Sequence, residues 1–189
     1  MQNSNFFTKT RWLVTIILLL SLGVGNSWAA DPTATFDFTS SSQWSTWGIT
    51  APTSNSTGVD LDDNDEFAVN DVTMTFTDGS STVCRCWKAT GGLEFRFYSG
   101  STVTFSVSSS YKIKSVYFNS TSSMAVSSPT GGSMSSNTWT PKSGTSPTSV
   151  EISASGSAKW TSVTVTYEAN ASCGSDPTVT AASSNGSFL

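Results

Sequence analysis

The sequence predicts an all-β protein, an antiparallel β-sandwich of jelly-roll-like form that follows a cleaved N-terminal signal helix. Three observations lead to this prediction. From Thr33 onward, apolar and polar residues alternate in short runs, which is the pattern of half-buried strands. Clusters of Gly and Ser separate most of the runs. No helical pattern lies between them, and many short strands without helices favour two packed sheets.

The N-terminal segment has the three parts of a secretory signal peptide. Lys9 and Arg11 precede an apolar stretch at 12–25, and Ser27 and Ala29 place small residues at the −3 and −1 positions of a cleavage site. This stretch is the one helical pattern in the chain. We expect export and cleavage after Ala29.

The chain therefore divides into three predicted segments. Residues 1–29 are the signal peptide, 30–168 form the sandwich module, and 169–189 are a linker and the truncated start of a further β module. No second apolar run is long enough to span a bilayer. We expect a secreted or cell-surface protein that has no membrane contact after cleavage.

Charge and composition exclude several function classes. The net charge is −4, and without Lys9 and Arg11 it falls to about −6, with seven basic against thirteen acidic residues, which argues against nucleic acid as a partner. The absence of histidine excludes Ser-His-Asp and Cys-His catalysis and a His-ligated zinc site. A two-carboxylate glycosidase is the main enzyme class left. Nothing places Glu94 and Glu151 across a cleft, so we expect no enzyme.

The alternation defines nine candidate strands. They cover 34–38, 72–77, 82–88, 93–98, 102–108, 111–118, 123–126, 149–153 and 159–168.

Short loops predict that the four strands from 72 to 108 form one meander. In this register Cys86 faces Phe95 on the inner side, while Trp87 faces Glu94 on the outer side. The remaining residues of the predicted inner layers are Met74, Phe76, Cys84, Phe97, Val103 and Phe105. The first and last strands are expected to cover this core from the other sheet with Phe36, Phe38, Val163, Val165 and Tyr167.

The outer side of the meander is the candidate ligand face. Trp87 and Tyr98 lie there as exposed rings that could stack on a sugar, with Arg85, Arg96 and Glu94 as polar anchors. The register sets Arg85 directly opposite Arg96, which indicates an acidic partner group, although Glu94 could also supply it. The alternative is an ordinary polar sheet face.

One acidic segment resembles a calcium loop. Asp65 stands where such a loop needs Gly, and Asp71 stands at its last position instead of Glu. The residues at the first, third, fifth and seventh positions are Asp60, Asp62, Asn64 and Glu66. A structural calcium site and a solvated acidic loop both remain open, and no other cofactor is expected.

Two of the three cysteines lie close together in the sequence, and two thiols alone make a poor metal site. Cys84 and Cys86 are two apart on one strand, about 6.6 Å between Cα atoms, which is long for a disulfide. We expect two buried core thiols. Cys173 is either a free thiol or the partner of a cysteine in a further module.

Short motifs along the chain resemble a β-sandwich module found in secreted, multi-modular bacterial surface proteins. They span about Thr33 to Glu168. The segment from Cys173 to Thr180 is similar to the start of an immunoglobulin-like repeat in such proteins. The resemblance implies a jelly-roll-like sandwich with a binding or spacer role and no catalytic residue. We expect a monomeric module with a glycan or a cell-surface protein as partner, and the alternative is a structural spacer in an adhesin stalk. The motifs are Phe36-Asp37-Phe38, Trp47-Gly48, 72–76, 93–99, 111–118, 137–140 and 163–167.

Overall fold

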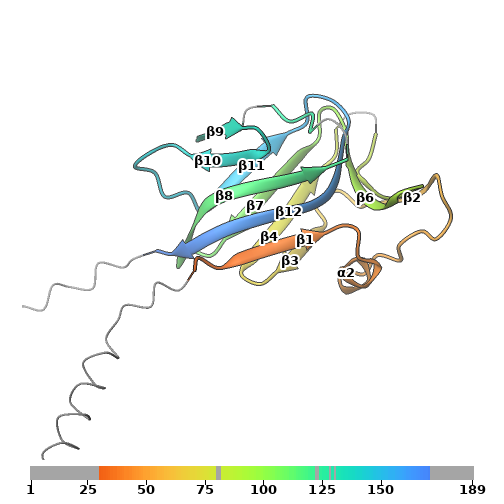
Figure 1. Cartoon of the computed structure of the whole chain (residues 1–189), viewed down its shortest axis with the longest axis horizontal. Coiled ribbons are helices and arrows are strands. Elements are labelled where there is room, and N and C mark those ends of the chain that lie inside the picture. Colours follow the sequence, from red (N-terminus) through yellow and green to blue (C-terminus); the bar gives the residue numbers. More distant parts are fainter. Residues whose placement is uncertain (1–29, 80–81, 122–123, 128, 130, 171–189) are drawn as a thin grey trace, which may run out of the picture. The chain divides into compact units, whose positions relative to one another are not determined.

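Two antiparallel sheets packed face to face make up the part of the chain that the computed structural model describes, residues 30–79, 82–121, 124–127, 129 and 131–170 (Figure 1). This confirms the predicted antiparallel β-sandwich. The eight-stranded large sheet runs in the order β2 (Thr57–Asp60), β5 (Arg85–Ala89), β6 (Gly92–Phe97), β12 (Ala158–Ala169), β8 (Tyr111–Ser120), β10 (Thr138–Pro141) and β9 (Gly132–Ser135), and β1 (Thr33–Asp37) also pairs with β12. The four-stranded small sheet has the order β11 (Ser149–Ser153), β7 (Thr102–Val107), β4 (Val72–Thr77) and β3 (Glu66–Val69).

Aromatic rings from both sheets meet in the core between them. The Phe36 ring of β1 lies 5.7 Å from the Phe105 ring of β7, and the Phe76 ring of β4 lies 5.8 Å from the Phe95 ring of β6, both in edge-on geometry. Each buried aromatic side chain removes about 150–250 Å² from water. The residues predicted to face inward are all buried, so the alternation identified the core correctly.

The predicted four-strand meander is wrong in its connections. β5 and β6 form the expected hairpin, in which Cys86 pairs with Phe95. β4, however, pairs with β7 in the small sheet, where Met74 lies opposite Phe105. A strand keeps the same inward-facing residues whether the next strand lies beside it or in the opposite sheet. The alternation alone therefore cannot choose between these arrangements.

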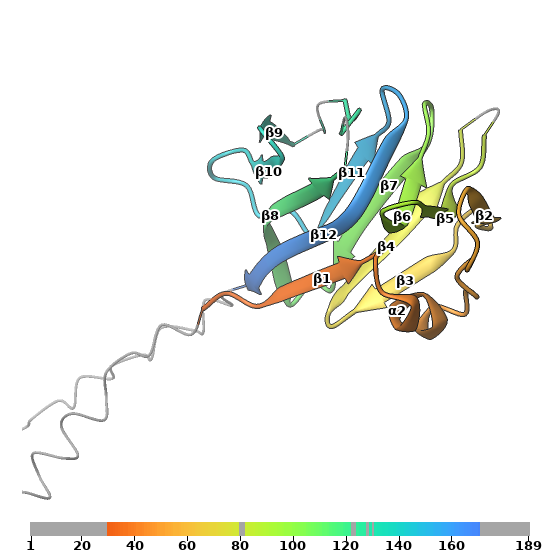
Figure 2. The ribbon, with the colours of Figure 1, turned by 45° about the vertical axis from the view of Figure 1, so that its right-hand side comes forward.

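Two crossovers carry the chain between the sheets at this point, one after β4 and one after β6 (Figure 2). They touch at Gly79, where an added Cβ would come within 2.6 Å of the Ser99 carbonyl oxygen. The Gly79 amide donates a 2.9 Å hydrogen bond to Oγ of the buried Ser101. The backbone contact between the crossovers therefore requires glycine.

One helix and four strands are absent from the sequence prediction. The helix α2 (Ser41–Thr46) has only six residues, too few to show a helical period. Ser40 caps it by accepting from the Gln43 amide, and the buried Trp44 indole donates to the Phe38 carbonyl over 2.8 Å. The four missed strands are β2, β3, β9 and β10. The predicted strand at 123–126 is reduced to one bridge between Val126 and Ala154, and residue 123 lies outside the described residues.

The first and last strands lie side by side. β1 pairs with β12 in antiparallel register, so Thr33 lies opposite Thr166 and the domain's chain enters and leaves at the same end (Figure 1). The predicted signal peptide at 1–29 and the tail at 171–189, including Cys173, lie outside the described residues. Among the described residues, no helix has the length and apolar character needed to cross a bilayer.

Candidate functional site

The hairpin of β5 and β6 places the predicted ligand residues on the outer face of the large sheet. Arg85 pairs with Arg96 and Trp87 pairs with Glu94, as the sequence predicts. Cys86 and Phe95 point the other way into the core. Because side chains alternate along a strand, burial of these two residues fixes the outward orientation of their neighbours.

Arg96 connects two of the predicted residues. Its guanidinium carbon lies 3.9 Å from the centroid of the Trp87 ring. Its Nε donates a 2.9 Å hydrogen bond to Oε1 of Glu94. Glu94 itself is only 4 % exposed, so the ion pair is largely shielded from water. The stack and the ion pair together hold the guanidinium in one place.

Arg85 has its own pair of partners. It forms a 2.8 Å ion pair with Asp60 of β2 and lies 5.8 Å from the centre of the Tyr98 ring. Its buried Nε has no hydrogen-bond partner among the described residues. The two arginines that face each other therefore each have a carboxylate of their own. The acidic group that the register indicates is supplied within the protein by Asp60 and Glu94.

These contacts change the predicted role of the aromatic rings. Trp87 is half-buried and lies against Gly58 of β2, where an added Cβ would come within 2.6 Å of the ring. Each of the two rings already has a guanidinium against it, Trp87 that of Arg96 and Tyr98 that of Arg85. The predicted five-residue face is thus an internally paired surface and not two open stacking platforms.

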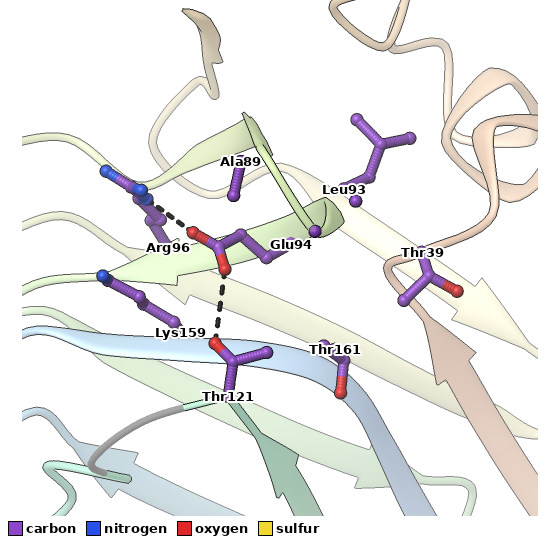
Figure 3. A pocket seen from close by; sticks show the side chains of 10 residues that line it. Thr39, Ala89, Leu93, Glu94, Arg96, Thr121, Lys159 and Thr161 are labelled. Atoms are coloured by element: carbon purple, nitrogen blue, oxygen red, sulfur yellow. Dashed lines mark hydrogen bonds and ion pairs between the residues drawn. The ribbon is translucent and has the colours of Figure 1, made fainter. Parts of the chain in front are cut away.

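A cavity of about 270 Å³ opens beside this surface and contains two of the predicted residues, Glu94 and Arg96 (Figure 3). The Glu94 carboxylate lies between Arg96 and Thr121, whose hydroxyl donates a 3.4 Å hydrogen bond to Oε2. The other lining residues are Thr39, Lys159, Thr161 and four residues in or beside the β5–β6 turn, Ala89, Gly91, Gly92 and Leu93. Hydroxyl groups and two cationic side chains therefore surround one buried carboxylate.

The sequence did not reveal the residues that β12 contributes to this cavity. Its inward-facing Val163 predicts that Thr161 and Lys159 also point inward, because they are an even number of residues away. A register shift between Trp160 and Ser162 reverses the alternation. Trp160 is therefore buried, and its two neighbours line the cavity. A tryptophan out of phase with the following valines is the signal that could have indicated this bulge.

The candidate calcium residues do not come together. Asp60 belongs to β2 of the large sheet and Glu66 to β3 of the small sheet, and the Asp60 carboxylate faces Arg85. Between them, Asp65 accepts from the Asp62 amide over 3.2 Å, and the Asn64 amide donates to the Phe76 carbonyl over 2.9 Å. Among the residues that the structure describes, no group of three acidic or thiol side chains could hold a metal ion. The four candidate side chains are exposed, which fits the alternative of a solvated acidic loop.

Cys84 and Cys86 are buried free thiols, as predicted. Burial raises the pKa of each from 9.0 to about 12. Both therefore stay protonated at neutral pH, and a protonated thiol is a poor nucleophile and metal ligand. They belong to the core and not to a reactive site.

Comparison with known proteins gives no match to a family model, a curated protein or a solved structure. The resemblance to modules of bacterial surface proteins stays a prediction from sequence motifs.

Proposed function

We propose that this protein is an exported, non-enzymatic binding module that holds a saccharide in the cavity on the outer face of the large sheet. One observation carries the proposal. Glu94, a buried carboxylate, lines an open cavity whose rim is formed by threonine hydroxyls and two cations. Burial of a charge is costly unless it is paired, and Arg96 and Thr121 supply that pairing while the carboxylate stays on the cavity wall.

The chemistry of the lining suits sugar hydroxyls. A carboxylate accepts hydrogen bonds, arginine and lysine donate them, and a threonine hydroxyl can do both. The cavity of about 270 Å³ is near the lower end of small-ligand pockets, which begin at about 300 Å³. It would hold one saccharide ring, with the rest of a longer glycan in solvent. Leu93 and Ala89 supply an apolar part of the wall.

The position of the carboxylates argues against glycoside hydrolysis. Such enzymes need two carboxyl groups that flank the scissile bond. Of the described residues that line the cavity, Glu94 alone carries a carboxylate. Glu151, the other candidate, is exposed on β11 of the small sheet. A binding role needs no second carboxylate.

The alternative role, a structural spacer in an adhesin stalk, is less well supported. A stalk of modules joined end to end needs the chain to enter each module at one end and leave at the other. Here Thr33 pairs with Thr166, so entry and exit are neighbours. This connection favours a module that projects from its attachment point and presents a binding face.

A glycan array tests the proposal on the exported, processed chain. We expect wild type to bind a defined set of glycans, and Glu94→Gln to weaken this binding about tenfold, which corresponds to about 1.4 kcal/mol. Glu151→Gln is the matched control, because it makes the same change on the small sheet. No glycan binding by wild type, or equal profiles for wild type and Glu94→Gln, would contradict the proposal.

A further inference from the structure

We propose that the saccharide bound in this cavity is acidic, and that its carboxylate or sulfate group lies against Lys159 beside Arg96; this inference rests on the proposed saccharide site. No feature of the sequence pattern assigns a role to Lys159. Its position in the sheet, the charges around it and the hydrogen bonds to its backbone all place it at the cavity.

Lys159 lies directly opposite Arg96 across the β12–β6 pair. Figure 3 shows both side chains extending in the same direction, to the left of the Glu94 carboxylate. Like charges at directly opposite positions destabilise a sheet. An arrangement of this kind persists at some cost in stability, and an anion placed between the two cations would remove that cost.

Glu94 does not balance both cations. Its Oε1 accepts from Arg96, and its Oε2 accepts from the Thr121 hydroxyl. Lys159 forms no ion pair with any residue in the described part of the chain. The cavity therefore has two cations and one carboxylate, a net charge of +1 in a protein with a net charge of −4.

The backbone of Lys159 is well anchored. Its carbonyl oxygen accepts a 2.9 Å hydrogen bond from the Ser120 hydroxyl and a 3.2 Å bond from the Thr121 amide. These bonds also fix Thr121 beside the lysine. An anionic group on a sugar ring could thus meet Lys159 while neighbouring ring hydroxyls meet Thr121 and Thr161.

Two other lysines without ion pairs do not share this setting. Lys142 lies just after β10 and is exposed, and Lys88 lies near the end of β5. Neither lines the cavity. Lys142 is therefore a suitable control position for a change of lysine charge away from the site.

The test compares saccharides that differ only in charge. Wild type is titrated by calorimetry with oligogalacturonate and its methyl ester, and with a sulfated oligosaccharide and its desulfated form. We expect at least one acidic member to bind about tenfold more tightly than its neutral partner, and added salt to weaken this binding. The pair that shows the preference distinguishes a carboxylate from a sulfate ligand.

Two variants show whether Lys159 causes the preference for the acidic saccharide. Lys159→Gln removes the charge in the cavity, and Lys142→Gln removes a lysine charge elsewhere as the control. We expect Lys159→Gln to lose about tenfold in affinity for the acidic member only, with a melting temperature equal to or above that of wild type, because the like-charge pair is gone. Lys142→Gln should bind as wild type does. Equal binding of neutral and acidic members would overturn this inference and leave the proposed saccharide site standing. Failure of both to bind, together with an empty glycan array, would overturn the proposed function as well.

Discussion

Replacing Glu94 with glutamine removes the negative charge that faces Arg96 and keeps the size of the side chain. A hydrogen bond that involves a charged group contributes about 1.5–3 kcal/mol to stability, and loss of one partner from a fully buried ion pair costs about 3–5 kcal/mol. The Glu94 side chain is 5 % exposed and that of Arg96 is 21 % exposed. In the variant the Arg96 guanidinium would still contact solvent and the Trp87 ring. The range for a charged hydrogen bond therefore applies, and not the larger range for a fully buried ion pair. We expect the free energy of unfolding to fall by about 2 kcal/mol.

Urea denaturation and calorimetry measure this loss. About 2 kcal/mol corresponds to a fall in melting temperature of about 6–8 °C for a domain of this size. Glu151→Gln is the control, because Glu151 is exposed and should change stability by less than about 0.5 kcal/mol. Arg96→Met completes a double-mutant cycle, since it keeps an apolar side chain against Trp87. We expect a coupling of about 1–2 kcal/mol between the two positions. Additive effects, or a Glu94→Gln protein as stable as the control, would show that the buried ion pair contributes nothing.

Two further predictions concern stability. Burial raises the pKa of Cys84 and of Cys86 from 9.0 to about 12, so the thiols lose their protons at a lower pH in the unfolded chain than in the folded protein. The free energy of unfolding should therefore be constant below pH 9 and fall between pH 9 and 12. At pH 10 we expect a loss of about 1.4 kcal/mol per thiol. Urea unfolding midpoints at pH 7 and pH 10 measure this loss. An equally large loss in the Cys84→Ala/Cys86→Ala protein would show that the two thiols do not cause it. Gly58→Ala should displace the Trp87 ring and cost about 1–3 kcal/mol, because the new Cβ would lie 2.6 Å from that ring. Gly91→Ala is the control and should leave the free energy of unfolding nearly unchanged, because nothing lies within 4 Å of the added Cβ. Unchanged tryptophan fluorescence in Gly58→Ala would show that the Trp87 ring does not lie against Gly58.

Local pattern was enough to predict the hairpin of β5 and β6. The turn between them is short, and a slip by one residue would turn Cys86 and Phe95 outward. Consequently the pairing of Trp87 with Glu94 could be predicted from the sequence. The same reasoning could not assign strands to sheets, because β4 buries the same residues in either sheet.

The cavity could not be predicted from the local sequence pattern, because strands that are distant in the sequence form it. Lys159 reaches the site only because of the bulge after Trp160 and because β12 pairs with β6, which places Lys159 opposite Arg96 from a distant part of the sequence. Thr121 follows the end of β8, which lies beside β12 through a second long-range pairing. Such pairings are decided by the packing of the whole sheet. The predicted stacking role of Trp87 was incomplete for a related reason, because the position of Arg96 over the ring depends on rotamers.

The pairing of the first strand with the last also constrains the order of folding. The Thr35 and Thr164 hydroxyls lie 3.1 Å apart across 129 positions of sequence. β1 has its sheet partner only when β12 is present, so the large sheet cannot be completed until nearly the whole domain has left the ribosome or an export channel. Contacts at such separation slow folding, and they make the domain cooperative from one end to the other. Loss of either terminal strand should therefore unfold the domain as a unit and not merely shorten it.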